Sequence, residues 1–303
     1  MKRRNFIQKT AASTALLSMT GIGLSCSRTS ATKITILHTN DVHSHVEEFG
    51  PNAGTNSNKG GVAKRAALVE SVRKENPNTL LLDAGDIFQG TPYFNFYGGE
   101  LEFKLMSLLK YDVATIGNHD FDNGINGLYA QLPHAKFDFI SANYDFSNTV
   151  MDTHVKPYKT FVKEGVKIGV FGLGIELNGL VNKEAYKETK YLDPVEIAQD
   201  MSRILKTEQQ CDLIICLSHL GYDYETSTSK ISDLRLAKAT QDIDLIIGGH
   251  THTFLDEPTI ETNAVGKKVI VNQVGCYGLY LGKIDFYFEA NQLKESDGSK
   301  LAV

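Results

Sequence analysis

The sequence contains little cysteine. Four cysteines occur in 303 residues, and three of them, Cys211, Cys216 and Cys276, follow the N-terminal segment. An odd number of thiols cannot close a set of disulfides, and Cys211 and Cys216 stand in an apolar run typical of small buried side chains. The cysteines therefore predict no disulfide framework, and they do not indicate a cellular compartment.

An excess of positive charge is also lacking. The formal net charge is -5, which argues against a surface for nucleic acid or for an anionic membrane. No internal repeat and no long low-complexity tract occurs, and a hydrophobic content of 42% with 22% charged residues is ordinary for a soluble globular protein. We expect a small molecule or another protein as the partner, and no nucleic acid polymer.

The N-terminal segment contains no apolar run long enough for a convincing membrane-spanning helix, because Ser, Thr and Gly interrupt it. Residues 1–26 combine a basic head with a weakly apolar middle, which is typical of a targeting segment. Arg3 and Arg4 followed by Phe6 resemble a twin-arginine export signal, which moves folded proteins. The stretch "GLSC" resembles a lipoprotein signal-peptidase box with Cys26 as the lipidated residue; the alternative is an ordinary cleaved signal with an incidental cysteine.

These features predict export to the periplasm, with membrane attachment only through a lipid on Cys26. Residues 27–32 then form a short polar tether. From Lys33 onward, short apolar runs alternate with stretches of helical period, the pattern of a layered α/β domain over residues 33–290. We expect residues 291–303 to be a polar C-terminal tail with little to pack. Strands are predicted at residues 33–38, 79–84, 112–116, 137–143, 166–174, 211–219, 242–249, 267–273 and 281–289, and helices at 61–76, 98–110, 193–210 and 229–240.

Several predicted strands run directly into residues that bind metals. The stretches concerned are "LHTNDVHSH", "LDAGDIFQG", "GNHDFD", "LSHLGYD" and "GGHTHT". Because sites in open α/β sheets form beyond the carboxyl ends of the strands, these five loops can converge. Taken singly, Asp41 with His43 is compatible with a turn, Asp86 with a helix cap and His219 with a buried core histidine. Together the oxygens and imidazoles suit a pair of divalent transition metals; the candidates are Asp41, His43, Asp86, Asn118, His219, His250 and His252.

An aromatic cluster follows Asp86 in "GTPYFNFYGG". Its rings, Tyr93, Phe94, Phe96 and Tyr97, are compatible with stacking against a nucleotide base. Burial in the core at the beginning of a helix is the interpretation we favour.

The motifs "DVHSH", "GDIFQGTP", "GNHDFD", "SHLG" and "GGHTHT", in this order, resemble those of the calcineurin-like metallophosphoesterases. The form of "GDIFQGTP" resembles the 5′-nucleotidase branch in particular, and the match begins at Lys33. The resemblance implies a single-domain, four-layer αββα sandwich with two divalent metal ions at the strand ends; Mn, Zn, Fe and Co are not distinguished. It implies one ion on Asp41, His43 and His252, another on Asn118, His219 and His250, and Asp86 bridging them.

The resemblance also implies a mechanism. A metal-bridging hydroxide attacks the phosphorus in line, while Asn118 and His119 contact the substrate. His119 stabilises the developing charge and protonates the leaving oxygen, and Asp122 orients His119. We interpret Asp120 as a structural residue outside the reaction.

These residues favour an exported di-metal phosphoesterase that hydrolyses phosphate esters, above all nucleotides. A cyclic-nucleotide phosphodiesterase or a sulfur-ester hydrolase of the same fold is an alternative, and a non-catalytic phosphate-binding lipoprotein is another. Members of the 5′-nucleotidase branch carry a C-terminal domain that supplies arginines and aromatic residues, and this chain ends near its expected start. We therefore expect either a separate C-terminal specificity-domain polypeptide or a catalytic domain that accepts a broad range of esters.

Overall fold

The computed structural model describes residues 31–225 and 230–303. The predicted export signal at 1–26, Cys26 and most of the expected tether therefore lie outside the described residues. Residues 32–303 form one compact unit. Across the two described stretches, no helix has the length and hydropathy needed to cross a bilayer.

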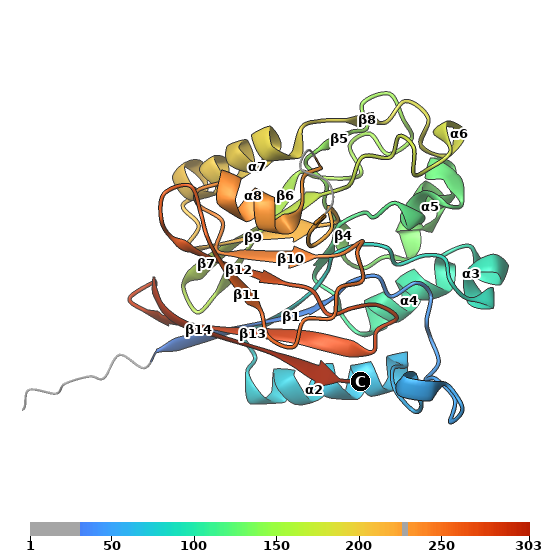
Figure 1. Cartoon of the computed structure of the whole chain (residues 1–303), viewed down its shortest axis with the longest axis horizontal. Helices are drawn as coiled ribbons and strands as arrows, with labels where there is room; N and C mark the ends of the chain where they lie inside the picture. The colour runs from blue at the N-terminus through green and yellow to red at the C-terminus, as the bar shows by residue number, and fades with distance from the viewer. Residues whose placement is uncertain (1–30, 226–229) are drawn as a thin grey trace, which may run out of the picture. The chain divides into compact units, whose positions relative to one another are not determined.

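Two six-stranded sheets form the centre of this unit (Figure 1). The first has the strand order β14-β13-β1-β2-β3-β4, in which β1 to β4 run parallel and β13 and β14 are antiparallel additions. Its strands are β1 (Thr32–Thr39), β2 (Thr79–Asp83), β3 (Val113–Ala114), β4 (Asp138–Phe139), β13 (Tyr280–Glu289) and β14 (Gln292–Ala302).

The second sheet has the order β11-β12-β10-β9-β7-β6, with four parallel central strands and an antiparallel strand at each edge. Its strands are β6 (Tyr158–Lys163), β7 (Val166–Leu173), β9 (Leu213–Ser218), β10 (Leu245–Gly248), β11 (Thr259–Thr262) and β12 (Lys268–Asn272). A separate pair joins β5 (Tyr144–Asp145) to β8 (Lys190–Tyr191).

The helices cover the outer faces of the two sheets. The first sheet packs against α2 (Val62–Glu75), α4 (Glu100–Leu108) and α5 (Gly124–Gln131), and the second against α7 (Pro194–Arg203) and α8 (Asp233–Ala239). Two further helices are short, α3 (Pro92–Tyr97) and α6 (Lys183–Tyr186). In Figure 1, α7 and α8 lie above the second sheet and α2 lies below the first. The predicted four-layer αββα arrangement is confirmed.

The alternation of side chains along the strands explains the layers. In β2, Leu80 and Leu82 join the core between the sheets, whereas Leu81 joins the core under the helices. In β9, Ile215 faces the other sheet and Cys216 faces the helices. Since successive side chains of a strand point to opposite faces, a strand buried on both sides reads as a continuous apolar run. Such runs made the strands visible in the sequence, and each of the nine predicted strands corresponds to a strand of the structure. The four predicted helices correspond to α2, α4, α7 and α8.

The prediction of an unpacked C-terminal tail was wrong. Residues 292–302 form β14, which pairs with β13, and Val303 is buried. The backbone N–H of Gly60 donates to the carbonyl of Val303 at 2.7 Å, and the N–H of Val303 donates to Leu279 at 3.0 Å. Most β14 side chains are exposed, and charged residues are typical of an edge strand, so its sequence shows no apolar alternation. The domain extends to Val303.

Candidate metal centre and active site

The candidate metal ligands all lie within four residues of the carboxyl ends of β1, β2, β3, β9 and β10. Three of these strands belong to the first sheet and two to the second. The ends of both sheets therefore meet around one locus, as expected for parallel strands whose connections return on the helical side. The structure brings all seven predicted ligands together there: Asp41, His43, Asp86, Asn118, His219, His250 and His252.

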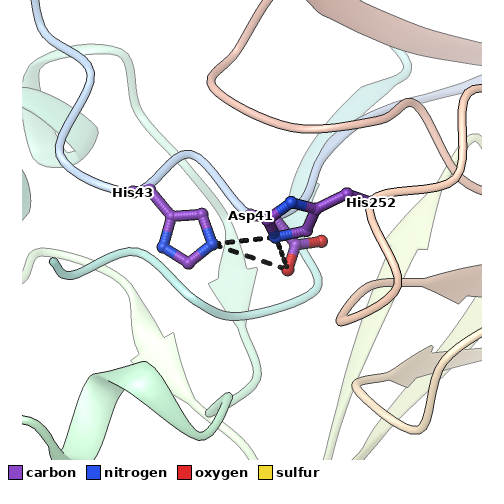
Figure 2. Close-up of side chains that lie close together, drawn as sticks. All are labelled: Asp41, His43 and His252. Carbon is purple, nitrogen blue, oxygen red and sulfur yellow. Dashed lines mark hydrogen bonds and ion pairs between the residues drawn. The ribbon is translucent and has the colours of Figure 1, made fainter. Parts of the chain in front are cut away.

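One group consists of Asp41, His43 and His252 (Figure 2). The Nε2 atoms of His43 and His252 lie 3.0 Å apart, and the Oδ1 atom of Asp41 lies 3.4 Å from Nε2 of His252 and 4.0 Å from Nε2 of His43. Figure 2 shows the three side chains pointing toward one another, Asp41 and His43 from the loop after β1 and His252 from the loop after β10. Two imidazole nitrogens and a carboxylate oxygen form a donor set that zinc and similar ions accept.

A second group consists of Asp86, His219 and His250. Nε2 of His219 lies 3.0 Å from Oδ2 of Asp86, and Oδ1 of Asn118 lies 2.8 Å from Nδ1 of His250. The same Oδ2 atom of Asp86 is 3.9 Å from Nε2 of His43 in the first group. Asp86 is thus placed between the two groups, which is the position that a bridging ligand requires.

Hydrogen bonds to the backbone orient the ligand imidazoles. Nδ1 of His219 donates to the carbonyl of Ala84 at 2.7 Å, and Nδ1 of His43 donates to the carbonyl of Phe88 at 3.1 Å. In both rings the Nε2 atom is left facing the centre, an arrangement that metal-binding histidines commonly use. Nε2 of His219 is buried, and within the described stretches its one charged neighbour at close range is Oδ2 of Asp86, without hydrogen-bond geometry. This inward-facing nitrogen and the surrounding donors fit a divalent metal ion.

The backbone at the site is strained. Five candidate ligands have positive φ angles: Asp41 at 49°, His43 at 50°, Asp86 at 56°, His250 at 72° and His252 at 51°. Side chains other than glycine rarely adopt this region, and such strain persists mainly where function requires it.

Glycines make close approach to the ligands feasible. A Cβ atom on Gly117 would lie 2.2 Å from Oδ1 of Asp86, and a Cβ atom on Gly249 would lie 2.8 Å from Nδ1 of His219. Neither contact is sterically allowed, so both loops require glycine for the ligands to reach their positions.

The carboxylates of Asp41 and Asp86 favour the protonated form of two histidines at the centre. Burial opposes the ionisation of both Asp86 and His219, but their mutual attraction prevails; it holds the pKa of Asp86 well below its usual range and raises the pKa of His219 to about 10. The hydrogen bond to Asp41 raises the pKa of His252 to about 10. By contrast, burial lowers the pKa of His43 and brings that of His250 to about 4. Opposed shifts within one cluster of side chains are characteristic of functional sites.

His119 and Asp122 form a pair at the open rim. Nδ1 of His119 donates to Oδ2 of Asp122 at 2.8 Å, and this hydrogen bond raises the pKa of His119. The backbone N–H of His119 donates to Oδ1 of Asp86 at 2.8 Å, which ties the pair to the metal-binding groups. The His119 ring lies 5.2 Å from the ring of His43, and its side chain is 40% exposed. An imidazole that Asp122 favours in its protonated form is therefore accessible beside the centre.

Asp120 is fully buried. Its two carboxylate oxygens accept four backbone N–H groups, from Gly117 at 2.8 Å, Asp86 at 3.1 Å, Ile87 at 2.9 Å and Phe88 at 3.1 Å. These bonds fasten the loop that carries Asp86 to the loop that carries Asn118. The sequence gives no sign of this clamp, because three of the four donors are main-chain groups from a distant segment.

The structure separates the aromatic residues of 93–97. Phe94 is buried against Phe88, with ring centroids 5.2 Å apart, as predicted. The core prediction was wrong for Phe96 and Tyr97, which are 84% and 53% exposed, because α3 buries only one side. The hydroxyl of Tyr93 donates to Glu47 at 2.7 Å.

Comparison with known proteins identifies the family. The sequence model of the calcineurin-like phosphoesterases matches residues 34–254. The chain belongs to the calcineurin-like phosphoesterase family. This calcineurin-like phosphoesterase is 36% identical over 287 residues to a snake venom 5′-nucleotidase from Crotalus adamanteus, a match that covers 87% of this chain and 47% of that protein. It is also 32% identical over 302 residues to the trifunctional nucleotide phosphoesterase protein YfkN of Bacillus subtilis, covering 89% of this chain and 19% of that protein.

A solved structure shares this fold. The crystal structure of the 5′-nucleotidase precursor from Thermus thermophilus matches this calcineurin-like phosphoesterase with a TM-score of 0.81 at 34% identity. The match covers 90% of this chain and 55% of the Thermus chain. The chain therefore spans about half of that protein, and half or less of the curated relatives named above.

Proposed function

We propose that the protein is an exported, metal-dependent phosphoesterase that hydrolyses nucleotides. The observation that carries this proposal is the pair of ligand groups joined by Asp86, with the His119–Asp122 pair at their rim. The names of the relatives that align with most of this chain, which are nucleotidases and a nucleotide phosphoesterase, support nucleotides as the substrate class.

In this proposal Asp41, His43 and His252 would hold one divalent ion, and Asn118, His219 and His250 would hold a second. Asp86, which lies between the two groups, would serve both. Two such ions supply Lewis-acid chemistry, because they lower the pKa of a water molecule and neutralise phosphoryl charge during in-line attack. The chain's contribution is to fix the donors, through the backbone hydrogen bonds to His43 and His219 and through the Asp120 clamp.

His119 acts on the leaving group. Asp122 engages Nδ1, which leaves Nε2 as the nitrogen that meets the substrate and donates a proton to the departing oxygen. The hydrogen bond to Asp122 raises the pKa of His119, which favours the protonated ring, and a protonated ring also stabilises charge on the phosphoryl group. Asn118 contacts both an ion and the substrate phosphate.

Export by a twin-arginine-like signal at residues 1–26 and lipidation at Cys26 complete the proposal. A separate specificity-domain polypeptide is a further proposed partner.

The test uses the purified protein loaded in turn with Mn, Zn, Fe or Co. We expect turnover of nucleoside monophosphates, with loss of activity after chelation and recovery when metal is restored. Cyclic nucleotides and a sulfur ester belong in the panel, and faster turnover of either reassigns the substrate class. Single-round binding of phosphate without hydrolysis of any ester favours the non-catalytic lipoprotein instead.

The catalytic assignment is tested by His119→Ala. The variant should retain its metal content while kcat falls by about 10²- to 10⁴-fold, the usual contribution of a general acid. Full turnover with both ions bound contradicts the assignment. His134→Ala, which removes a histidine from the short 3₁₀ turn after α5, is the matched control and should keep wild-type kcat.

A further inference from the structure

Three aromatic rings from two distant loops stack beside the first ligand group. His45 and Phe49 follow β1, and Tyr277 follows β12. The His45 ring stacks on Phe49 with centroids 5.0 Å apart and an interplanar angle of 20°, and Tyr277 lies 4.3 Å from His45. All three rings are partly exposed. They form a preassembled aromatic surface, which we call the Tyr277 platform.

The platform adjoins the candidate metal centre. The ring of Tyr277 lies 6.1 Å from that of His43 and 5.9 Å from that of His252. In addition, the backbone N–H of Tyr277 donates to the carbonyl of Asp41 at 2.7 Å. A group bound beside the His43 and His252 side chains is therefore within reach of the Tyr277 ring. The loop that carries this ring is also fastened to a candidate ligand.

The backbone at Tyr277 is strained. Its φ angle is 62°, and the neighbouring Gly275 and Gly278 have φ angles of 76° and 62°. Glycine adopts this region without strain, whereas a bulky side chain there is an outlier. A third glycine at position 277 would be the unstrained choice for such a loop. The side chain present has its ring against the rings of the centre, and retained strain of this kind is a feature of functional positions.

We propose that the Tyr277 platform stacks against a planar aromatic ring in the organic part of the substrate, such as the base of a nucleotide. The proposal rests on the function proposed above and gives this chain a specificity element of its own. Stacking of a base on an aromatic side chain tolerates every base, because each presents a π face, and it needs no charged partner. Because the rings are already assembled, little side-chain freedom is lost on binding.

The experiment compares 5′-AMP with ribose 5-phosphate, which has the same phosphate and sugar but no base. In the wild-type protein kcat/KM should favour AMP by at least about tenfold, the scale of one base stacked on one aromatic ring. Tyr277→Asn should reduce this preference by about the same factor, mainly through KM for AMP, since asparagine accepts the left-handed backbone but offers no ring. Tyr277→Phe should keep the preference, because the ring and not the hydroxyl is the contact.

Tyr129→Asn is the matched control, because Tyr129 is also exposed and packs edge-on against a histidine, His154, at 5.1 Å. It should leave the preference at the wild-type value. Phe49→Leu removes the ring that stacks on His45 without changing the strained residue, and it should also lower the preference for AMP. It is the substitute test if Tyr277→Asn does not fold.

Equal kcat/KM for AMP and ribose 5-phosphate in the wild-type protein overturns the proposal while leaving the hydrolase intact. Equal losses for both esters in Tyr277→Asn also overturn it, since they indicate that the rings only support the loop. If neither ester is hydrolysed, the proposed function fails, and a binding measurement then tests the Tyr277 platform separately. Adenosine, which lacks phosphate, should then still shift ring signals of the wild-type protein in NMR titration, with the shift lost in Tyr277→Asn; no shift in the wild type refutes the stacking.

Discussion

Replacing Asp120 by asparagine tests whether the buried carboxylate holds the active-site loops together. An asparagine side chain has almost the same shape, but it has one acceptor oxygen where the carboxylate has two. Asp120 accepts two N–H groups on each oxygen, so its replacement leaves two of the four donors facing an NH₂ group. Each buried donor left without an acceptor costs about 1–3 kcal/mol, and the expected loss of stability is therefore about 2–6 kcal/mol.

A loss of this size is a large part of the total stability of a domain, which is on the order of 5–15 kcal/mol. The measurement is urea unfolding of the chelated protein at about pH 8.5. This pH is chosen because burial and the neighbouring Asp86 raise the pKa of Asp120 to about 7, so the wild-type side chain is ionised there. The four N–H donors belong to the loop that carries Asp86 and to Gly117. The metal affinity of Asp120→Asn, measured by isothermal titration calorimetry, should therefore fall by about ten- to a hundredfold.

Asp145→Asn is the matched control. Asp145, in the short strand β5, accepts one backbone N–H, from Ser147 at 2.9 Å, and pairs with Lys190 at 3.2 Å at the surface. Its replacement should cost less than about 1 kcal/mol, because surface ion pairs contribute little. If Asp120→Asn and Asp145→Asn unfold at the same urea concentration, Asp120 is not a clamp. If Asp120→Asn is destabilised but binds metal as tightly as the wild type, the clamp supports the fold without positioning the ligands.

Three further outcomes are expected. His219→Ala should bind the second metal ion at least ten- to a hundredfold more weakly, measured by metal analysis after dialysis; unchanged metal content would show that His219 is not a ligand. Burial lowers the pKa of His38 to about 3 from 6.5, so the unfolded chain alone takes up this proton as the pH falls below 6.5. Between about pH 7 and pH 5, the chelated wild-type protein should therefore lose about 2 kcal/mol more stability than the chelated His38→Gln variant. Buried acids with raised pKa values have the opposite effect on stability in both proteins, so the test is the difference between the two proteins. Deleting 292–303 should lower the unfolding midpoint and promote association in light scattering, because it leaves the edge of β13 unpaired; a monomer of wild-type stability would contradict this.

The sequence by itself located the strands and the candidate site. Each central strand is buried on both faces, so it reads as a continuous apolar run that ends where polar residues begin. Parallel strands end at the same edge of a sheet, and Asp41, Asp86, Asn118, His219 and His250 follow such ends directly. The site therefore follows from strand boundaries and side-chain chemistry, both of which are local properties of the chain.

Only the tertiary structure decided the remaining features. Asp120 looks like one more polar residue in "GNHDFD", and its role depends on backbone donors from the loop after β2. β14 forms because β13 offers it a partner, although its own polar sequence shows no burial. Tyr277 is far from His43 in sequence and has no metal-binding motif around it, yet the two rings lie 6.1 Å apart. Such contacts depend on how distant loops fold against one another, and local sequence carries no signal of that arrangement.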